Sequence, residues 1–252
     1  MSYHESVARQ AEPDVASVMD LIESGGVPSE GELIKVLRRP TCPGVLVERL
    51  AACPWLLSSR RALQLVVRHP RCPRHFAWDV LPRLGWHDLL EVARDPRTSP
   101  AIRKQSERKL AERLNGLTLG ERSALARQAP RSVVGVLLAD EQPLCVEALV
   151  SNPHFTETEA LRLLHGNRNP ECVLVLLRHA VWGRKPEVLR AAVRSERVPL
   201  GVALGLLALL PETDMEALAA STEVRGPLRA AAARLLRRRR AYPAPRSGPS
   251  TP

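Results

Sequence analysis

The chain has 252 residues, of which 44% are hydrophobic and 25% charged, and its formal net charge is +10. These are ordinary values for a globular protein that is large enough for one extended or two compact domains. The absence of a run of about 20 apolar residues predicts no membrane span, the first residues do not resemble a signal peptide, and five cysteines without framework spacing predict free thiols in a cytoplasmic protein.

Residues 1–26 are predicted to form a degenerate, acidic N-terminal cap. Residues 1–32 carry one arginine and seven acidic residues, which is a net charge of −6. The pair Leu21–Ile22 weakly matches Ala148–Leu149 further along the chain. This match suggests that the repeated unit described below begins before residue 27.

Residues 27–114 are predicted to form a first helical unit. Turns that contain proline recur at Arg39–Pro43, His69–Pro73 and Asp95–Pro100, and apolar residues follow at positions i, i+3, i+4 and i+7. That periodicity is typical of an amphipathic helix, and proline suits the first turn, where its missing N–H is not needed. We therefore predict first-turn positions for six prolines: Pro43, Pro73, Pro100, Pro170, Pro199 and Pro227.

Residues 115–153 are predicted to be connecting helical repeats, and residues 154–240 repeat the first unit. The two copies align at an offset of 127 residues from Ser29 through Trp55, and at 126 residues after a later one-residue slip. Chance would rarely place so many matches in one register, so we predict an internal duplication. The matches include Pro43 with Pro170, Leu50 with Leu177, Trp55 with Trp182, Pro73 with Pro199, Asp88 with Asp214, Ala93 with Ala219, and Arg103 with Arg229.

The last predicted helix ends on the arginine run Arg237–Arg240, where cations are favoured by the helix dipole. The tail 241–252 is rich in proline and serine and is predicted to be disordered. The run is interpreted either as a solubilising end of the helix or as a nonspecific anion-binding segment.

Short helix pairs cannot bury their apolar faces alone, whereas stacked pairs form a continuous core. We therefore predict an all-α protein, an α-solenoid of about seven to eight short helical hairpins with an internal duplication. The stretches Leu117–Ala126, Glu147–Pro153 and Val193–Val202 resemble bacterial HEAT-like and leucine-rich-repeat-variant α-solenoids of uncharacterised function. The resemblance covers about residues 27–240 and implies a fold but no activity. Some leucine-rich-repeat-variant proteins hold an N-terminal iron–sulfur cluster, but this N-terminus lacks the clustered cysteines.

Residues that might carry chemistry have simpler interpretations. Cys42 and Cys72 occupy the same place in the repeated turn, which predicts small buried side chains, because no cysteine has the spacing of a metal site. His75 and Asp79 are four residues apart on a predicted helix and are interpreted as an exposed polar face rather than as a base with its orienting partner. No nucleotide-binding or hydrolase motif occurs. We therefore expect no enzyme, no cofactor and no metal.

Charge distinguishes the two copies. Residues 33–114 carry a net charge of +10, residues 115–224 carry −2, and residues 225–252 carry +8. In the predicted alignment, arginines of copy one face uncharged residues of copy two: Arg39 with Gly166, Arg49 with Leu176, Arg61 with Val188, Arg74 with Leu200 and Arg83 with Leu209. The candidate residues for binding an anionic partner are Arg38, Arg39, Arg49, Arg60, Arg61, Arg68, Arg71, Arg74, Arg83, Arg237, Arg238, Arg239 and Arg240. The alternative is a solvated helix face.

The segment Pro199–Leu210 has no polar side chain. It is interpreted as a helix at the centre of the stack, with a docking face for a partner or a second copy as the alternative. The expected function is a non-enzymatic scaffold that binds another protein. The alternative is a nucleic-acid binder that contacts the phosphate backbone through the basic first unit and the arginine run.

Overall fold

The computed structural model describes residues 15–241, and this part of the chain is helical throughout, with no strand. It contains sixteen α-helices and five short 3₁₀ helices, named α1–α16 and η1–η5 in chain order. The predicted all-α class is therefore confirmed. Among the described residues, no helix is both long enough and apolar enough to cross a membrane. The predicted disordered tail, apart from Ala241, lies outside the described residues.

The chain divides into two compact units, with unit 1 ending at Asn115 and unit 2 beginning at Gly116. Unit 1 contains α1 (Val15–Glu23), α2 (Glu30–Leu37), α3 (Gly44–Ala52), η1 (Pro54–Ser58), α4 (Arg60–Val67), α5 (Arg74–Val80), η2 (Leu81–Arg83), α6 (Trp86–Arg94) and α7 (Pro100–Arg113). The short helix η3 (Leu114–Gly116) spans the division. Unit 2 contains α8 (Leu119–Gln128), α9 (Arg131–Leu137), α10 (Pro143–Val150), α11 (Glu157–Gly166), α12 (Pro170–Arg178), η4 (Trp182–Arg184), α13 (Pro186–Arg194), α14 (Leu200–Leu206), η5 (Leu207–Leu209), α15 (Glu212–Ala220) and α16 (Gly226–Ala241).

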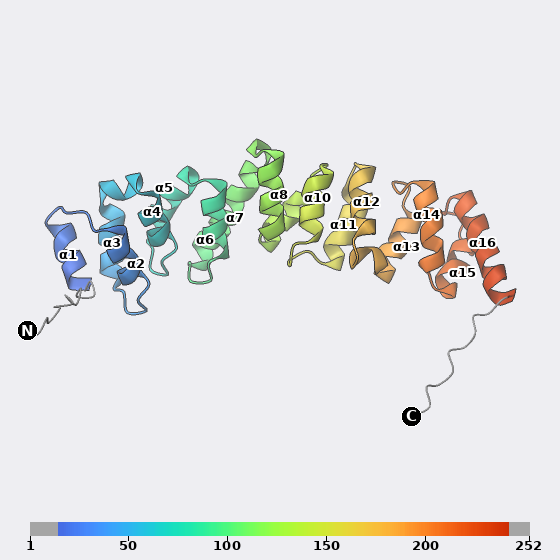
Figure 1. Cartoon of the computed structure of the whole chain (residues 1–252), viewed down its shortest axis with the longest axis horizontal. Helices are drawn as coiled ribbons and strands as arrows, with labels where there is room; N and C mark the ends of the chain where they lie inside the picture. Colours follow the sequence, from blue (N-terminus) through green and yellow to red (C-terminus); the bar gives the residue numbers. More distant parts are fainter. Residues whose placement is uncertain (1–14, 242–252) are drawn as a thin grey trace, which may run out of the picture. The chain divides into compact units, whose positions relative to one another are not determined.

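Within each unit the helices stand side by side and are joined by short turns at alternating ends (Figure 1). In unit 1, α2 packs on α4 and α4 on α6, while α1 packs on α3 and α5 on α7. In unit 2, α8 packs on α10 and α10 on α12, while α11 packs on α13 and α14 on α16. Each helix contributes a few fully buried aliphatic side chains, such as Leu46, Leu89 and Leu163. Small and medium aliphatic residues fill these cores because the helices are too short to enclose many aromatic rings.

Side-chain caps define where several helices begin. Ser29 and Glu32 form a capping box at the start of α2, and Thr118 with Glu121 does the same for α8. Such a box satisfies backbone N–H groups that have no partner within the helix. Of the six predicted first-turn prolines, Pro100, Pro170 and Pro227 lie inside the first turn of their helices. The other three precede the helix as its N-cap residue: Pro43, Pro73 and Pro199.

Buried amide side chains fix two turns of unit 2. The Nδ2 of Asn152 donates to the carbonyl oxygens of Ala126 (2.7 Å) and Ala129 (3.1 Å), and its Oδ1 accepts from the backbone N–H of His154. Asn167 repeats the arrangement, since its Nδ2 donates to the carbonyl of Asp140 at 2.8 Å and its Oδ1 accepts from the N–H of Asn169. Each asparagine thus closes its own turn and binds it to an earlier turn.

The element order of α2–α7 recurs in α11–α16. The starts of α3, α4, α5, α6 and α7 precede those of α12, α13, α14, α15 and α16 by 126 residues, as Gly44 and Pro170 show, whereas α2 and α11 start 127 residues apart. The buried positions have the same spacing. Leu37 of α2 corresponds to Leu164 of α11 at 127, and Leu50 of α3 corresponds to Leu176 of α12 at 126.

These buried positions correct the predicted alignment of α3 and α4. An offset of 127 would pair the exposed Arg49 with Leu176 and the exposed Arg61 with Val188, yet Leu176 and Val188 are fully buried. The one-residue slip therefore lies between α2 and α3 and not after Trp55. In the corrected register the residues of unit 2 that correspond to Arg49, Arg60 and Arg61 are Val175, Pro186 and Glu187.

Two arginines at corresponding positions make the same contacts in the two units. Arg113, at the end of α7, donates to the carbonyl oxygens of Pro82 and Leu84. Arg239, 126 residues later in α16, donates to those of Ala208 (2.7 Å) and Leu210 (3.0 Å). Because an arginine provides five N–H donors in a fixed fork, one side chain satisfies two carbonyls of a helix end that lack intrahelical partners.

The prediction that Pro199–Leu210 is a central, buried helix is wrong. Ala203 is the only residue of α14 that is buried, while Leu200 is 37% exposed and Leu209 is 60% exposed. The segment contacts α13 and α16, which leaves part of its surface open. Its apolar composition therefore does not reflect burial on all sides.

Candidate functional site

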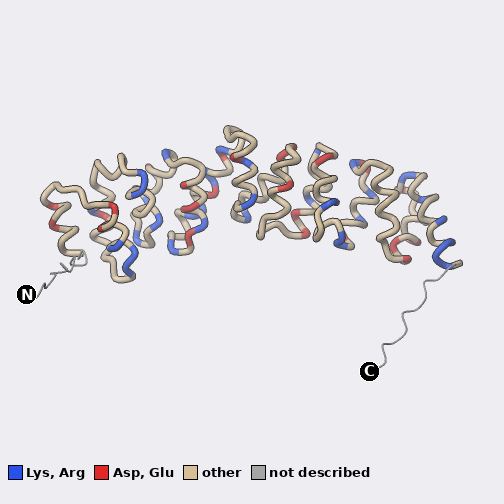
Figure 2. The backbone as a smooth tube through the Cα atoms, viewed as in Figure 1, with Lys and Arg blue, Asp and Glu red and all other residues tan. Residues whose placement is uncertain are grey.

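The predicted arginines of unit 1 lie at two opposite edges of the helix layers. The first edge is made of the α2–α3, α4–α5 and α6–α7 turns, residues 38–43, 68–74 and 94–100, and we call it the arginine edge. It contains seven arginines and one acidic residue, Asp95. The basic positions of these turns are visible as blue segments along the tube in Figure 2. The predicted residues at this edge are Arg38, Arg39, Arg68, Arg71 and Arg74.

Hydrogen bonds between successive turns place the three segments side by side. The Nη1 of Arg71 donates to the carbonyl oxygen of Cys42 at 2.9 Å, which joins the second turn to the first. The Oγ1 of Thr98 donates to the carbonyl of Arg68 at 3.2 Å, which joins the third turn to the second. The arginine edge is therefore one continuous strip within unit 1.

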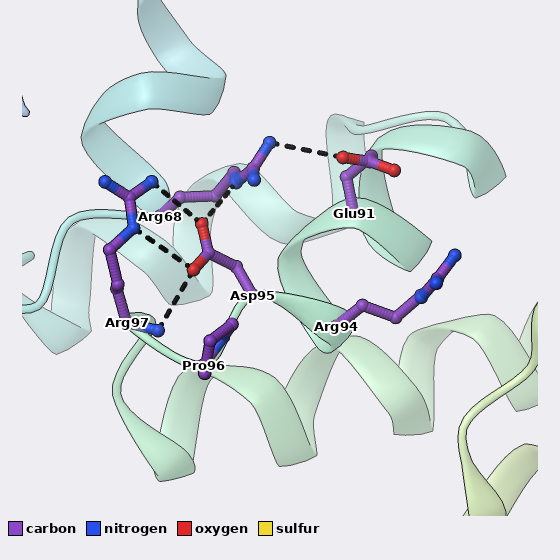
Figure 3. Close-up of a pocket in the computed structure, with 6 residues that line it drawn as sticks. All are labelled: Arg68, Glu91, Arg94, Asp95, Pro96 and Arg97. Carbon is purple, nitrogen blue, oxygen red and sulfur yellow. Dashed lines mark hydrogen bonds and ion pairs between the residues drawn. The ribbon is translucent and has the colours of Figure 1, made fainter.

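Asp95 is the acidic centre of the third turn (Figure 3). Its carboxylate accepts hydrogen bonds from the Nε of Arg68 at 2.8 Å and from the Nη2 of Arg97 at 3.1 Å, and it also accepts from the backbone N–H of Arg97. The Nη1 of Arg68 lies 3.3 Å from Glu91. Although burial raises the pKa of Asp95, the hydrogen bonds from Arg97 and Arg68 lower it from 3.8 to about 2. This carboxylate is thus ionised and shared by two guanidinium groups.

The corresponding position of the second turn holds His69 in place of an acid. His69 is buried, and its Nδ1 accepts the backbone N–H of Arg71 at 3.1 Å. Burial lowers the pKa of His69, and the nearby Arg71 and Arg97 lower it further. A neutral imidazole provides no negative charge, so the arginines around the second turn have no carboxylate like that of Asp95.

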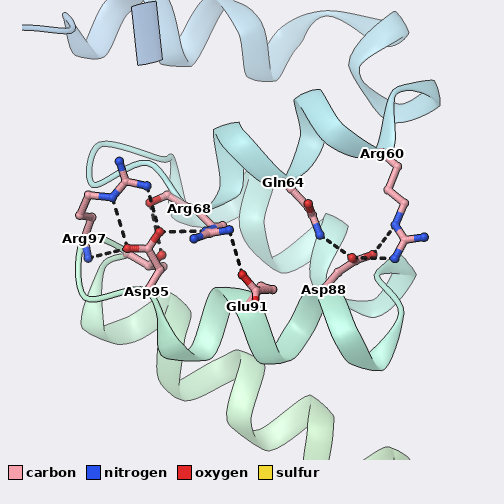
Figure 4. A network of polar contacts seen from close by, with 8 residues as sticks. Arg60, Gln64, Arg68, Asp88, Glu91, Asp95 and Arg97 are labelled. Atoms are coloured by element: carbon pink, nitrogen blue, oxygen red, sulfur yellow. Dashed lines mark hydrogen bonds and ion pairs between the residues drawn. The ribbon is translucent and has the colours of Figure 1, made fainter. Parts of the chain in front are cut away.

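The opposite edge, formed by the α3–α4 and α5–α6 connections, carries Arg49, Arg60, Arg61 and Arg83. Here acidic side chains answer part of the positive charge. Arg60 donates to both carboxylate oxygens of Asp88 at 2.8 Å, and Gln64 donates to the same group (Figure 4). Arg61 lies 3.5 Å from Glu30.

Four of the predicted arginines have exposed side chains and no hydrogen bond or ion pair within residues 15–241: Arg38, Arg49, Arg74 and Arg83. Arg38 and Arg74 lie at the arginine edge, and Arg49 and Arg83 lie at the opposite edge. The predicted set therefore does not form one patch. It consists of a strip with little internal neutralisation and a second, partly neutralised edge.

The predicted C-terminal run lies in unit 2, at the end of α16. Arg239 holds the two carbonyls described above, and Arg240 forms an ion pair with Glu216. Arg237 and Arg238 are exposed. Half of the run thus serves the fold of its own unit.

The residues considered for catalysis are not gathered into a site. His75 and Asp79 are both exposed on α5, and no hydrogen bond joins them within the part of the chain that is described. Cys42 and Cys72 are buried, as the repeated turn predicted, and burial raises the pKa of the Cys72 thiol to about 12. No group of three or more histidine, cysteine or acidic side chains among residues 15–241 is arranged to hold a metal ion.

Sequence reasoning missed Arg97, which completes the Asp95 cluster, and Arg113, which fixes the end of η2. Both carried a signal. Arg97 occupies the same place as Arg71 in the repeated Pro-Arg turn, and Arg113 has an arginine 126 residues later. An arginine kept in both units at one position, such as Arg113 with Arg239 or Arg71 with Arg197, binds a backbone carbonyl of a neighbouring turn.

Neither a family model, nor a curated protein, nor a solved structure matches the chain.

Proposed function

We propose that the protein is a non-enzymatic scaffold, an α-solenoid related to HEAT-like and leucine-rich-repeat-variant proteins, that binds another protein. The observation that carries this proposal is the difference between equivalent turns of the two units. The arginine edge of unit 1 has seven arginines and one acid, whereas the corresponding turns of unit 2, residues 165–170, 194–200 and 220–226, have four arginines and two acids.

An internal duplication explains this pattern economically. Two copies of one unit would inherit the same buried positions and the same carbonyl-binding arginines, because those residues hold the fold. Exposed positions are under no such requirement, so a difference confined to them indicates selection for a surface. Repeat proteins bind partners through extended surfaces of this kind rather than through an enclosed pocket.

A second function is favoured by the same positive charge. The arginine edge and the exposed Arg237 and Arg238 are suited to the phosphate backbone of nucleic acid, which is bound through Lys and Arg with a steep dependence on salt. Recognition would depend on the backbone and not on sequence, because no aromatic side chain other than the buried His69 imidazole lies within the three turns.

The test is affinity capture of the tagged, full-length chain from the cells that produce it, with and without nuclease treatment. The scaffold proposal predicts the same protein partner in replicate captures, whether or not nuclease is present. Recovery of no reproducible protein contradicts it. Loss of every captured protein on nuclease treatment, together with a low-salt gel shift of duplex DNA or RNA by the purified chain, supports the nucleic-acid function instead.

A further inference from the structure

We propose that the arginine edge of unit 1 binds an acidic segment of a partner protein, in an extended conformation with carboxylates at about every third residue. This inference rests on the proposed scaffold function and deepens it by naming the surface and the chemistry of its partner. It follows from the charge of the edge, from the binding of Asp95 and from the spacing of the turns.

The arginine edge has more positive charge than the chain itself neutralises. Asp95 and Glu91 satisfy Arg68 and Arg97 in the second and third turns. Around the first and second turns, Arg38 and Arg74 are exposed and have no side-chain partner within the described residues, and Arg71 uses only its Nη1, on the Cys42 carbonyl. The opposite edge is less suitable, since its bases Arg60 and Arg61 already face Asp88 and Glu30.

The Asp95 cluster shows what kind of anion these turns bind. There, an arginine that ends one helix, Arg68, and an arginine two residues into the next turn, Arg97, share one carboxylate. Arg38 and Arg71 occupy the same two positions one turn earlier, where the intervening residue is the neutral His69. A carboxylate from outside the chain would restore at this exposed place the charge pairing that Asp95 provides internally, with the charge-assisted hydrogen bonds that guanidinium groups make.

The spacing of the turns selects the conformation of the segment. Consecutive turns follow packed helices, whose axes lie about 8–10 Å apart. A chain in the polyproline II conformation rises about 3.1 Å per residue with three residues per turn, so its side chains face the same way about every 9 Å. One carboxylate at each third residue therefore meets one turn of the edge. Single-stranded nucleic acid is a poorer match because the edge offers no aromatic platform: Trp78, the exposed tryptophan of α5, lies one helical turn beyond Arg74.

The test uses the full-length chain and three labelled probes in a fluorescence-anisotropy titration at low and at physiological salt. The first probe is the twelve-residue peptide (Glu-Pro-Pro)₄, the second is a peptide of the same composition with its four glutamates adjacent, and the third is a twelve-base-pair DNA duplex. We expect the spaced peptide to bind at least several-fold more tightly than the clustered peptide, and its binding to weaken as salt rises.

Two matched variants locate the site. Arg38→Glu with Arg74→Glu reverses two partnerless charges at the arginine edge, and Arg49→Glu with Arg83→Glu reverses two at the opposite edge of the same unit. We expect the first variant to lose at least tenfold in affinity for the spaced peptide and the second to lose less than threefold. Equal losses would show that net charge alone attracts the peptide and would overturn the proposal. Circular dichroism must show that both variants keep the helical content of the parent chain.

Two other outcomes also overturn the inference. Equal binding of the spaced and clustered peptides contradicts the extended, three-residue spacing. Tighter binding of the duplex, lost in Arg38→Glu with Arg74→Glu, assigns the edge to nucleic acid. A failure here is distinguishable from failure of the scaffold proposal: a protein partner that is still captured by the Arg38→Glu with Arg74→Glu variant leaves the scaffold standing and places its binding surface elsewhere.

Discussion

Helix α5 of unit 1 and helix α14 of unit 2 occupy the same place in the order of elements, yet their exposed positions have opposite chemistry. Arg74 and Arg83 of unit 1 correspond to the exposed Leu200 and Leu209 of unit 2. The buried positions of these helices agree, as Ala77 and Ala203 show. The difference teaches that the repeated unit constrains its core strictly and its surface hardly at all, so function should be sought in the exposed positions that differ.

The largest effect should come from a substitution that tests the corrected register. Val188→Arg should destabilise unit 2 by more than about 4 kcal/mol, since Val188 is fully buried and an arginine there would place a charge in the core. Denaturant unfolding followed by circular dichroism measures the loss. Glu187→Arg, at the position that corresponds to Arg61, should change stability by no more than about 0.5 kcal/mol. If Val188→Arg were tolerated and Glu187→Arg were not, the alignment at 127 residues would be correct.

Acid should weaken the arginine edge of unit 1 more than the equivalent turns of unit 2. The Asp95 carboxyl titrates near 3.8 when unfolded and at about 2 when folded. Its contribution of about 2 kcal/mol is therefore complete above about pH 5, falls by about half by pH 3 and disappears below pH 2. The neutral, buried His69 adds a loss of stability as the pH falls below 6.5, because its folded pKa is lowered and the unfolded imidazole binds the proton more readily.

The measurement is the difference in unfolding free energy between the parent chain and Asp95→Asn, determined at pH 7 and at pH 3. This difference should shrink as the pH falls. Ser221→Ala is the control, because Ser221 holds the corresponding place in unit 2 and has no carboxyl group. An Asp95→Asn effect that stays constant with pH would mean that the carboxylate charge contributes nothing to the fold.

The shared carbonyl-binding arginines should be worth similar amounts in the two units. Arg113→Ala and Arg239→Ala each remove two hydrogen bonds from a charged group to backbone carbonyls, and each should cost about 1–2 kcal/mol. Hydrogen-exchange mass spectrometry should show faster exchange near residues 81–85 in the first variant and near 207–211 in the second. A large loss in one unit and none in the other would break the structural equivalence of α7 and α16.

The smallest predicted effect is a gain in stability. Ser106 of α7 is fully buried, and its hydroxyl has no hydrogen-bond partner in the described structure. The corresponding residue of α16 is Ala232, which is equally buried. Ser106→Ala should therefore stabilise unit 1 by about 1 kcal/mol, because it removes an unpaired polar group and improves helix propensity. A decrease in stability would indicate that the hydroxyl is bonded.

The sequence was sufficient to predict features that depend on periodicity. The apolar spacing predicted helices, the proline turns predicted where many of them begin, and the repeated turn predicted that Cys42 and Cys72 are buried. The slip between the copies was misplaced because Trp55 and Trp182 resemble each other more than their surroundings do. Only the burial of Leu176 and Val188 reveals which neighbouring residue faces the core.

The candidate site was less predictable for a physical reason. A sequence counts arginines but does not show which carboxylate or carbonyl each one meets in space. Arg60 binds Asp88 from 28 residues away, and Arg239 binds carbonyls about 30 residues earlier in the chain. Such pairings depend on how turns align along an edge. The apolar segment at Leu200 was misjudged similarly, because hydrophobic composition does not reveal whether a neighbouring helix covers it.

The most direct test of the central claim, that one repeated unit carries two different surfaces, is to move the arginine edge from unit 1 to unit 2. In the Arg38→Glu with Arg74→Glu background, His165→Arg and Leu200→Arg place arginines at the corresponding positions of unit 2. Anisotropy titration with (Glu-Pro-Pro)₄ is the measurement. The account predicts that binding lost from unit 1 is regained to within about tenfold of the parent chain, a difference of about 1.4 kcal/mol. A folded quadruple variant that binds no better than its Arg38→Glu with Arg74→Glu parent would contradict the equivalence of the two edges.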